Sequence, residues 1–173
     1  MNTFIDMILT RHSVREFTGE IIQKEDLETI VKAGMSAPSA VNIQPWAFII
    51  ITEKKILNSL CQNLPYAKML DKAGAAIIVC GIPEKDDQIA QKFWMMDCSA
   101  ATENILLAAH SLSYGAVWTA VYPDEDRIKT VREECNIPNN IIPLNVIPIG
   151  IPVNRNAQPI DKYKSENIHW NKW

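Results

Sequence analysis

The stretch from Gln88 to Ser113 constrains the fold more than any other part of this 173-residue sequence. It contains neither glycine nor proline and is rich in alanine, leucine and methionine, which predicts one long helix with Gly115 at its C-terminal cap. The helix is apolar over most of its circumference, so it has to be buried on several sides. A chain of this length achieves that most easily as one domain, residues 1–173, that packs against a second copy of itself.

Four apolar or β-branched stretches have the composition of buried strands. They are Trp46–Ile51, Ala75–Gly81, Ala116–Val121 and Asn145–Ile151. Pro148 lacks a backbone N–H, which predicts that the last strand lies at a sheet edge or contains a bulge. Three further segments have helical spacing. They are a short helix with Phe4, Met7 and Ile8 on one face, a second that follows Asp26 and ends near Met35, and a third that begins at Pro123 and stops at Pro138.

The charge and composition of the chain argue against several classes of partner. With a net charge of −3, it has no general attraction for nucleic acid or anionic lipid, so an anion would need a local cluster of cations. The uncharged segment Asn104–Pro123 is as long as a membrane span, but His110 and Gly115 interrupt it and favour a buried helix that leads into a buried strand. The four cysteines are widely spaced and follow no secretory signal, which indicates reduced thiols and a cytoplasmic location.

Cationic side chains alternate near both ends of the sequence. In an extended segment, Arg11, Ser13 and Arg15 would face one side and offer two guanidiniums and a hydroxyl to a single anion, which is phosphate-binding chemistry. Lys162 and Lys164 repeat the alternation near the other end. The alternative for either pattern by itself is a solvated basic segment.

The segment Pro38–Trp46 places Ser39, Asn42 and Gln44 on a loop fixed by two prolines, directly before a predicted strand. A rigid loop that presents amides suits a polar heterocycle, although the same residues also form ordinary turns. Other chemistry has less support. The sequence contains no Gly-x-Gly-x-x-Gly motif and no metal-ligand spacing, and His12 and His110 have no nucleophile and acid to accompany them.

In combination these blocks resemble the nitroreductase family of FMN enzymes. The resemblance rests on Arg11-His12-Ser13-Val14-Arg15 and Ala37-Pro38-Ser39-Ala40-Val41-Asn42-Ile43-Gln44-Pro45-Trp46, and it continues through Ala108–Trp118, Ile149–Pro152 and Lys162–Lys164. It implies an α+β, three-layer fold in which helices flank a central, mostly antiparallel sheet and a C-terminal arm extends onto the partner subunit. It also implies a homodimer with FMN sites at its interface.

Carried over residue by residue, the resemblance implies where the cofactor lies. Arg11 and Ser13 would hold the FMN phosphate, with His12 in the same binding segment, while Lys162 and Lys164 close on it from the far end. Arg15 would lie beside N1 and O2 of the isoalloxazine, where a cation stabilises the negative charge of the reduced ring.

The remaining assigned residues would surround the ring. Asn42 and Gln44 would hydrogen-bond the ribityl chain or the ring edge, and the strand Trp118-Thr119-Ala120 would pass the N5 edge, where a backbone N–H can bond the atom that accepts hydride. Pro38, Ser39 and Ala40 would reach the flavin of the other subunit. Many relatives have a glycine-rich turn where this chain has Thr119-Ala120-Val121-Tyr122, a difference that bears on the substrate side.

The function that follows is an FMN-dependent oxidoreductase, with FMN rather than a protein residue carrying the chemistry. Hydride would pass from NAD(P)H through flavin N5 to an oxidised acceptor such as a nitroaromatic or a quinone, with ping-pong kinetics. Two alternatives stay open at this point. One is a specialised FMN reductase of the dehalogenase or enoyl type, and the other is a non-catalytic protein that binds or stores flavin.

Overall fold

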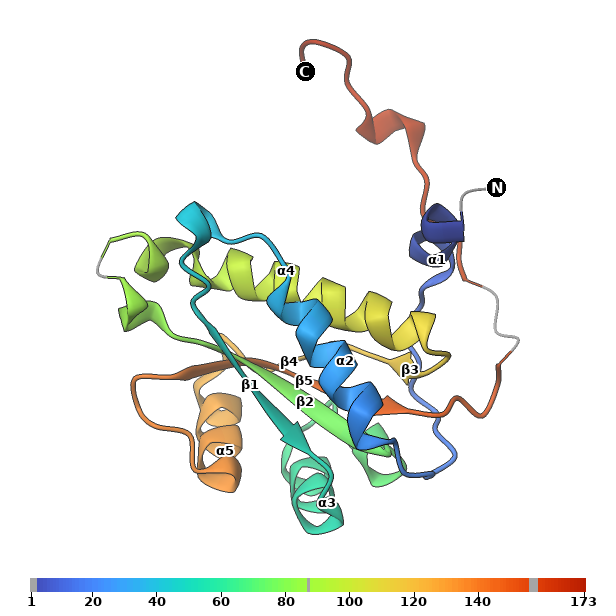
Figure 1. The fold of residues 1–173 in the computed structure, drawn as a ribbon, viewed down its shortest axis with the longest axis vertical. Helices are drawn as coiled ribbons and strands as arrows, with labels where there is room; N and C mark the ends of the chain where they lie inside the picture. Colours follow the sequence, from blue (N-terminus) through green and yellow to red (C-terminus); the bar gives the residue numbers. More distant parts are fainter. Residues whose placement is uncertain (1–2, 87, 156–158) are drawn as a thin grey trace.

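A five-stranded sheet forms the centre of the structure, a computed structural model that describes residues 3–86, 88–155 and 159–173 (Figure 1). The strands are β1 (Trp46–Ile51), β2 (Ala75–Gly81), β3 (Gly115–Ala116), β4 (Thr119–Ala120) and β5 (Ile142–Gly150). The sheet has the order β1-β2-β5-β3, and β4 also pairs with β5. Every one of these pairings is antiparallel.

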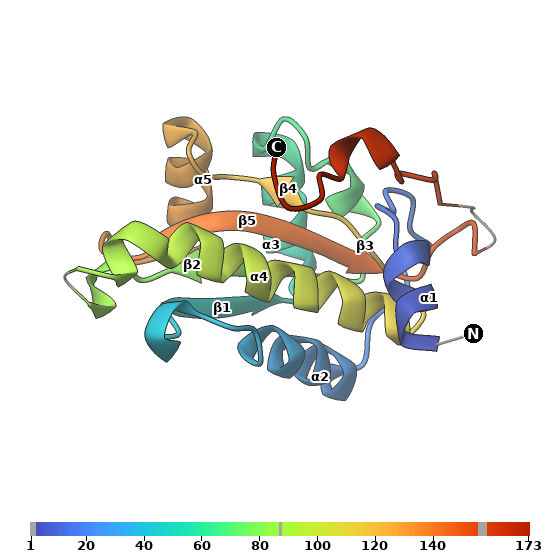
Figure 2. The same ribbon diagram turned by 90° about the horizontal axis from the view of Figure 1, so that it is seen from above.

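Helices cover both faces of the sheet (Figure 2). The helices α2 (Lys24–Met35) and α4 (Ala90–Ser111) lie on one face, and α3 (Lys54–Asn63) and α5 (Glu125–Cys135) lie on the other. The short helix α1 (Thr3–Thr10) contacts α4 near the C-terminal end of that helix. The predicted α+β, three-layer arrangement of helices around an antiparallel sheet is therefore confirmed.

Strand β2 shows why the molecule has two core layers. All seven of its residues are buried, and successive side chains point to opposite faces of the sheet. Ile77 and Val79 pack with α2 and α4, whereas Ile78 and Cys80 pack with α3 and α5. A strand that is apolar at every position needs helices on both sides, and the sequence supplies them.

The region after α4 differs from its prediction as one strand over Ala116–Val121. It forms two short strands, β3 and β4, that pair with β5 in a single register, with Ala116 opposite Ile149 and Thr119 opposite Val146. That register sets Val117 opposite Pro148, which has no N–H to donate, so the ladder breaks there. Pro148 does not mark an edge strand, because β5 lies inside the sheet. The alternative, a bulge in this strand, is present but away from Pro148: Val79 pairs with Asn145 and Cys80 with Pro143, so Leu144 is the extra residue.

The other sequence expectations are largely confirmed. Strands β1 and β2 have the predicted bounds, and α2, α4 and α5 lie within or near their predicted ranges. The predicted cap at Gly115 is wrong, because α4 ends at Ser111 with Leu112 as its cap, Ser113 takes the left-handed turn (φ 65°), and Gly115 begins β3. Helix α3 was not anticipated, since it offers only Leu57 and Leu60 as buried residues. All four cysteines are free thiols, two of them buried and two half-buried. Among the described residues, no helix combines the length and the apolar composition that a membrane span requires.

Candidate functional site

Residues 11–15, called here the Arg11 segment, follow α1 and lie against β3. The backbone N–H of Val14 donates to Ala116 O at 3.0 Å, and Ser13 forms a parallel bridge with Ala116. This close approach needs Gly115, because a Cβ at that position would lie 2.6 Å from Val14 Cγ1. Residues 13–14 and 115–116, about a hundred residues apart in sequence, therefore lie side by side.

Side chains of this segment alternate in their surroundings. Ser13 and Arg15 are exposed, whereas His12 and Val14 are half-buried and line a cavity of about 230 Å³ on their own side. Arg11 lines a different and larger cavity of about 520 Å³. Exposure alternates along residues 12–15, but the cavity that Arg11 lines includes neither Ser13 nor Arg15, so a single anion shared by all three side chains stays a prediction.

The larger cavity, called here the Arg11 cavity, lies between the end of α1 and the C-terminal arm (residues 159–173). Its charged lining consists of Arg11, Glu103, Asp161 and Lys162. Arg11 is only 16% exposed, and its Nε lies 3.3 Å from Glu103 Oε1. The structure thus brings together one cation from each of the two predicted basic patterns, Arg11 and Lys162.

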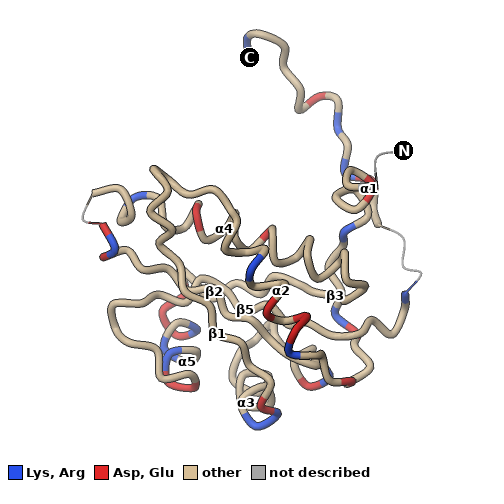
Figure 3. The backbone as a smooth tube through the Cα atoms, viewed as in Figure 1, with Lys and Arg blue, Asp and Glu red and all other residues tan. Residues whose placement is uncertain are grey.

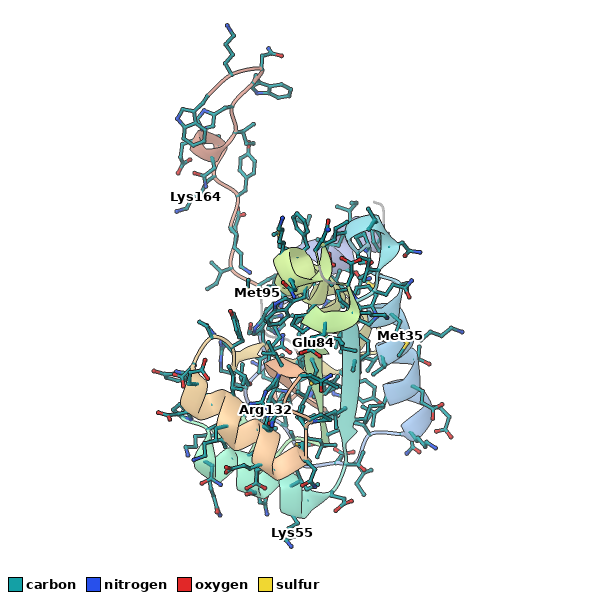
Figure 4. The ribbon with its side chains drawn as sticks, turned by 90° about the vertical axis from the view of Figure 1, so that its left-hand side faces the viewer. Met35, Lys55, Glu84, Met95, Arg132 and Lys164 are labelled. Atoms are coloured by element: carbon teal, nitrogen blue, oxygen red, sulfur yellow. The ribbon has the colours of Figure 1, made fainter. Side chains whose placement is uncertain are left out.

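Lys164 lies farther out along the arm, away from the body of the molecule (Figure 4). It is exposed and is not part of the Arg11 cavity lining. Lysine and arginine positions follow α1 and recur on the arm along the backbone in Figure 3, which places both cationic segments at the same end of the molecule. A single chain therefore supplies part of the predicted set of cations.

The donors at the Arg11 cavity fit a phosphate group. Glu103 engages only Nε of Arg11, and no other described residue bonds its guanidinium, so four of its five N–H donors remain for an anion. Lys162 adds an ammonium group, and Ile8, Leu9 and Ile160 add apolar walls. The cavity volume is within the usual range of small-ligand sites, about 300–1,000 Å³.

Residues 38–44, called here the amide loop, form a second polar group. The side chains of Asn42 and Gln44 are exposed and bonded to each other, with Gln44 Nε2 donating to Asn42 Oδ1 at 3.0 Å. Ser39 Oγ accepts from the backbone N–H of Gln44 at 2.9 Å. Pro38 is exposed, and Ala40 is half-buried.

The amide loop and the Arg11 segment lie at opposite ends of α4 (Figure 1). The loop contacts α4 at Asp97, and the end of α1 contacts it at His110, thirteen residues farther along. That separation corresponds to about 20 Å of helix. Within one chain the structure therefore does not bring Asn42 and Gln44 to Arg11.

Strand β4 and its neighbours present one exposed residue. Trp118 is half-buried against the α2 and α4 layer, and Thr119 is buried with its hydroxyl donating to Val146 O at 2.6 Å. Ala120 is exposed, and its carbonyl accepts from Arg127 Nη1 at 3.3 Å. The guanidinium of Arg127 lies 5.0 Å from the centroid of the Tyr66 ring.

Sequence reasoning missed three residues at these sites. Arg127 and Tyr66 adjoin Ala120, and Glu103 pairs with Arg11. The spacing of Asp124, the N-cap of α5, and Arg127 in its first turn could have indicated their ion pair, which measures 3.3 Å from Arg127 Nε to Asp124 Oδ2. Nothing local in the sequence could have placed Tyr66 or Glu103, because their partners lie far along the chain.

His12 and His110 both contact Thr10 at the junction of α1 and α4. His12 Nδ1 lies 3.1 Å from Thr10 O, and His110 Nε2 lies 3.0 Å from Thr10 Oγ1. Burial, followed by His12 and Arg11 as neighbouring positive groups, lowers the pKa of His110. These contacts support a structural role for the pair.

An antiparallel sheet between helical layers defines an α+β domain, and the Arg11 cavity, lined by two cations and two carboxylates, is its candidate anion-binding site. Comparison with known proteins is more specific. Residues 8–151 match the model of the Nitroreductase family. A relative from Archaeoglobus fulgidus, named "Putative NADH dehydrogenase/NAD(P)H nitroreductase", is 42% identical over 175 residues that cover 100% of both chains. The chain therefore belongs to the nitroreductase family.

Solved structures agree with this assignment. A protein from Parabacteroides distasonis with the same name has a TM-score of 0.93 and 45% identity, with 100% of each chain covered. A structure named "FMN-dependent Nitroreductase", from Clostridium difficile, has a TM-score of 0.88 and 28% identity over 98% of this chain and 99% of that one.

Proposed function

We propose that this chain is an FMN-dependent oxidoreductase that passes hydride from NAD(P)H to an oxidised acceptor such as a nitroaromatic or a quinone. The observation that carries the proposal is the Arg11 cavity, where cations from both ends of the chain meet next to the segment that bridges to β3. Membership of the nitroreductase family supports it, as do relatives whose names include NAD(P)H and FMN.

In this proposal the phosphate of FMN lies between Arg11, Ser13 and Lys162, with His12 behind them and Lys164 closing from the arm. Charge-assisted hydrogen bonds of this kind contribute about 1.5–3 kcal/mol each. Glu103 holds Nε of Arg11 and so directs the rest of the guanidinium toward the anion. Bound FMN supplies the chemistry by accepting hydride at N5 and delivering it to the acceptor.

The ring of the cofactor is assigned to Arg15 and to Trp118, Thr119 and Ala120. Arg15 is exposed near β3, where its cation can stabilise negative charge on the pyrimidine edge of the ring. Ala120 is the exposed residue of β4, and its backbone can face the N5 edge. The buried hydroxyl of Thr119 is bonded to Val146 O, which fixes this part of the backbone.

A second copy completes the site. The amide loop lies about 20 Å along α4 from the Arg11 segment, so its residues Pro38, Ser39, Ala40, Asn42 and Gln44 are assigned to the flavin of the partner subunit. Exposed apolar side chains such as Leu9 (67%) and Met96 (60%) provide a surface for that contact. The proposed unit is thus a homodimer with FMN sites at its interface, in which residues 1–173 act as one domain and the cysteines stay reduced in the cytoplasm.

The test is to mix the yellow purified protein anaerobically with NADPH or NADH in a stopped-flow instrument, and then with a quinone or a nitroaromatic. We expect the visible flavin band to be bleached by the donor and restored by the acceptor. Initial rates should give parallel double-reciprocal lines, because one cleft serves both substrates in turn. A flavin that stays oxidised with either donor would identify a storage protein, and intersecting lines would refute the ping-pong order.

A further inference from the structure

We propose that Asp97 is the positioning residue that holds the amide loop in the conformation that meets the flavin. Asp97 is on the first half of α4 and is only 6% exposed. Its Oδ1 accepts a hydrogen bond from the backbone N–H of Ala40 at 3.0 Å. The inference rests on the proposed function for the role of the loop, but the contact itself belongs to the chain.

The surroundings of Asp97 show that this carboxylate does little else. Its Oδ2 is buried and makes no hydrogen bond to any described residue. No lysine or arginine in the described part of the chain forms an ion pair with it. A buried acid with one empty oxygen is unfavourable for folding, and its neighbours Trp94, Cys98 and Ala101 are apolar. Among its described contacts, the hydrogen bond to Ala40 is therefore the one that an apolar side chain at position 97 could not make.

The amide loop needs to be held, because its backbone is strained. Val41, Asn42 and Gln44 have positive φ values of 43°, 60° and 56°, and a β-branched residue such as Val41 rarely adopts that region. Such conformations persist only where the surrounding structure fixes them.

The loop is fixed at two ends. Lys85 Nζ donates to Gln44 O at 2.8 Å, and Ser39 Oγ accepts from Gln44 N, so both contacts act on residue 44. At the other end, Asp97 holds Ala40 from α4. In Figure 4, the labels of Met95, on α4 two residues before Asp97, and of Glu84, next to Lys85, show where these two anchors lie. A loop preorganised in this way loses less entropy when it closes on a flavin, so its rigidity should appear in the affinity for FMN.

The first experiment compares Asp97→Ala, Asp97→Asn and the parent by hydrogen–deuterium exchange without FMN and by fluorimetric FMN titration. In Asp97→Ala we expect exchange in residues 40–44 to be faster by about tenfold or more and the Kd for FMN to rise by a similar factor, because a hydrogen bond to a charged acceptor is lost. Asp97→Asn keeps an oxygen that can accept from Ala40, so it should restore slow exchange and most of the affinity.

Leu57→Ala is the matched control for a general loss of packing, because Leu57 is 1% exposed and lies in the α3 and α5 layer, on the other face of the sheet. It should lose more thermal stability than Asp97→Ala and yet keep the parent affinity for FMN. If Leu57→Ala weakened FMN binding as much as Asp97→Ala does, the effect would be general destabilisation and the inference would be wrong.

Ala40→Pro removes the same hydrogen bond from the loop side and leaves Asp97 in place. Ser39 already has the extended conformation (φ −139°, ψ 156°) that a following proline requires. This variant should reproduce the fast exchange and weak binding of Asp97→Ala, and the double variant should be no worse than either single one. If the parent binds FMN and both variants match it in exchange and affinity, Asp97 has no such role. If the parent does not bind FMN, the proposed function is wrong. The exchange data then still show whether the Asp97–Ala40 hydrogen bond holds the loop.

Discussion

Arg11 has the central position in the proposed phosphate site, and its ion pair with Glu103 sets the orientation of its guanidinium. The two side chains are 16% and 50% exposed, so their ion pair is worth at most about 1 kcal/mol. Its effect is instead geometric, because it occupies Nε and leaves the outer nitrogens to a ligand. The sequence predicted Arg11 and Lys162 from simple alternation, whereas Glu103 required the three-dimensional fold.

Replacing either cation of the Arg11 cavity should weaken FMN binding. For Arg11→Ala and Lys162→Ala we expect the Kd to rise about 10- to 150-fold, which corresponds to about 1.5–3 kcal/mol for a charge-assisted contact. Fluorimetric titration measures it. Lys55→Ala is the control, since Lys55 lies at the far end of the molecule in Figure 4 and should leave the Kd unchanged. Parent-like affinity in both variants would remove the phosphate from this cavity.

Arg15 should act on the redox potential more than on affinity. Replacing it with leucine removes a cation from the pyrimidine edge of the ring, so Arg15→Leu should lower the midpoint potential of the bound flavin. Spectroelectrochemical titration would detect the shift. Arg15→Lys keeps the charge and should stay close to the parent. An unchanged potential in the leucine variant would place Arg15 elsewhere.

His110 should make stability depend on pH. Burial, and then His12 and Arg11, lower its pKa below the ordinary value near 6.5, so the unfolded chain takes up this proton more readily than the folded one. Its contribution to stability is thus present above about pH 6.5 and is lost as the pH falls through the lowered pKa. We expect Tm to fall on acidification from about pH 7.5 to about pH 5.5, and to fall less in His110→Gln. His169→Gln, on the arm, is the control; equal falls in all three proteins would contradict the assignment.

Among the elements, the strands β1 and β2 were predictable from sequence because each is a short apolar run with clear ends. The β3 and β4 region was not, because its interruption comes from Pro148, thirty residues away along the chain and opposite in the ladder. Helix α3 was missed because it buries only Leu57 and Leu60. Local pattern therefore identified the elements buried on several sides and failed where a distant partner sets the structure.

Strand β2 and helix α4 approach each other closely at Gly81, and this contact can be tested. A Cβ there would lie 2.1 Å from Trp94 Cε3. Trp94 is only 4% exposed, and its ring packs edge-on against Tyr122, with 5.0 Å between the two ring centroids. Because the ring has no room to move, Gly81→Ala should destabilise the fold by about 1–3 kcal/mol. Urea unfolding measures this. A second substitution, Trp94→Leu, should relieve the clash and make the added methyl nearly neutral; if it does not, the contact is not the cause.

At the scale of the whole molecule, the site joins residues from both ends of the sequence. The Arg11 segment, β3 and the first residues of the arm lie near one end of α4, and the sequence motifs predicted that they belong to one site. From the sequence, the resemblance implied that Pro38, Ser39 and Ala40 reach the partner's flavin, but it did not place Asn42 and Gln44, because their distance from Arg11 depends on the direction of α4. Since one chain separates the loop from the Arg11 cavity by about 20 Å of helix, the proposed site requires two chains.

The arm should therefore support the dimer and the cofactor site together. It extends away from the body in Figure 1, and its tryptophans Trp170 and Trp173 are 85% and 101% exposed, which is unfavourable for large aromatic groups unless a partner covers them. Deleting the chain after Tyr163 removes both tryptophans and Lys164. We expect a weaker dimer in sedimentation velocity and weaker FMN binding in titration, because an interface of about 2,000 Å² or more would lose part of its area and the site would lose a cation.

Two further proteins separate the contributions of area and charge. Lys164→Ala in the full-length chain should reduce FMN affinity and leave the dimer intact. The double variant Trp170→Ala/Trp173→Ala should weaken the dimer first and should lose FMN only at protein concentrations where the subunits separate. FMN occupancy in that second protein should then follow protein concentration, because the partner's amide loop is needed for binding. A truncated chain that sediments as a monomer and still holds one reducible FMN per subunit would show that the site is complete within one chain, and that the shared-site dimer is the wrong description.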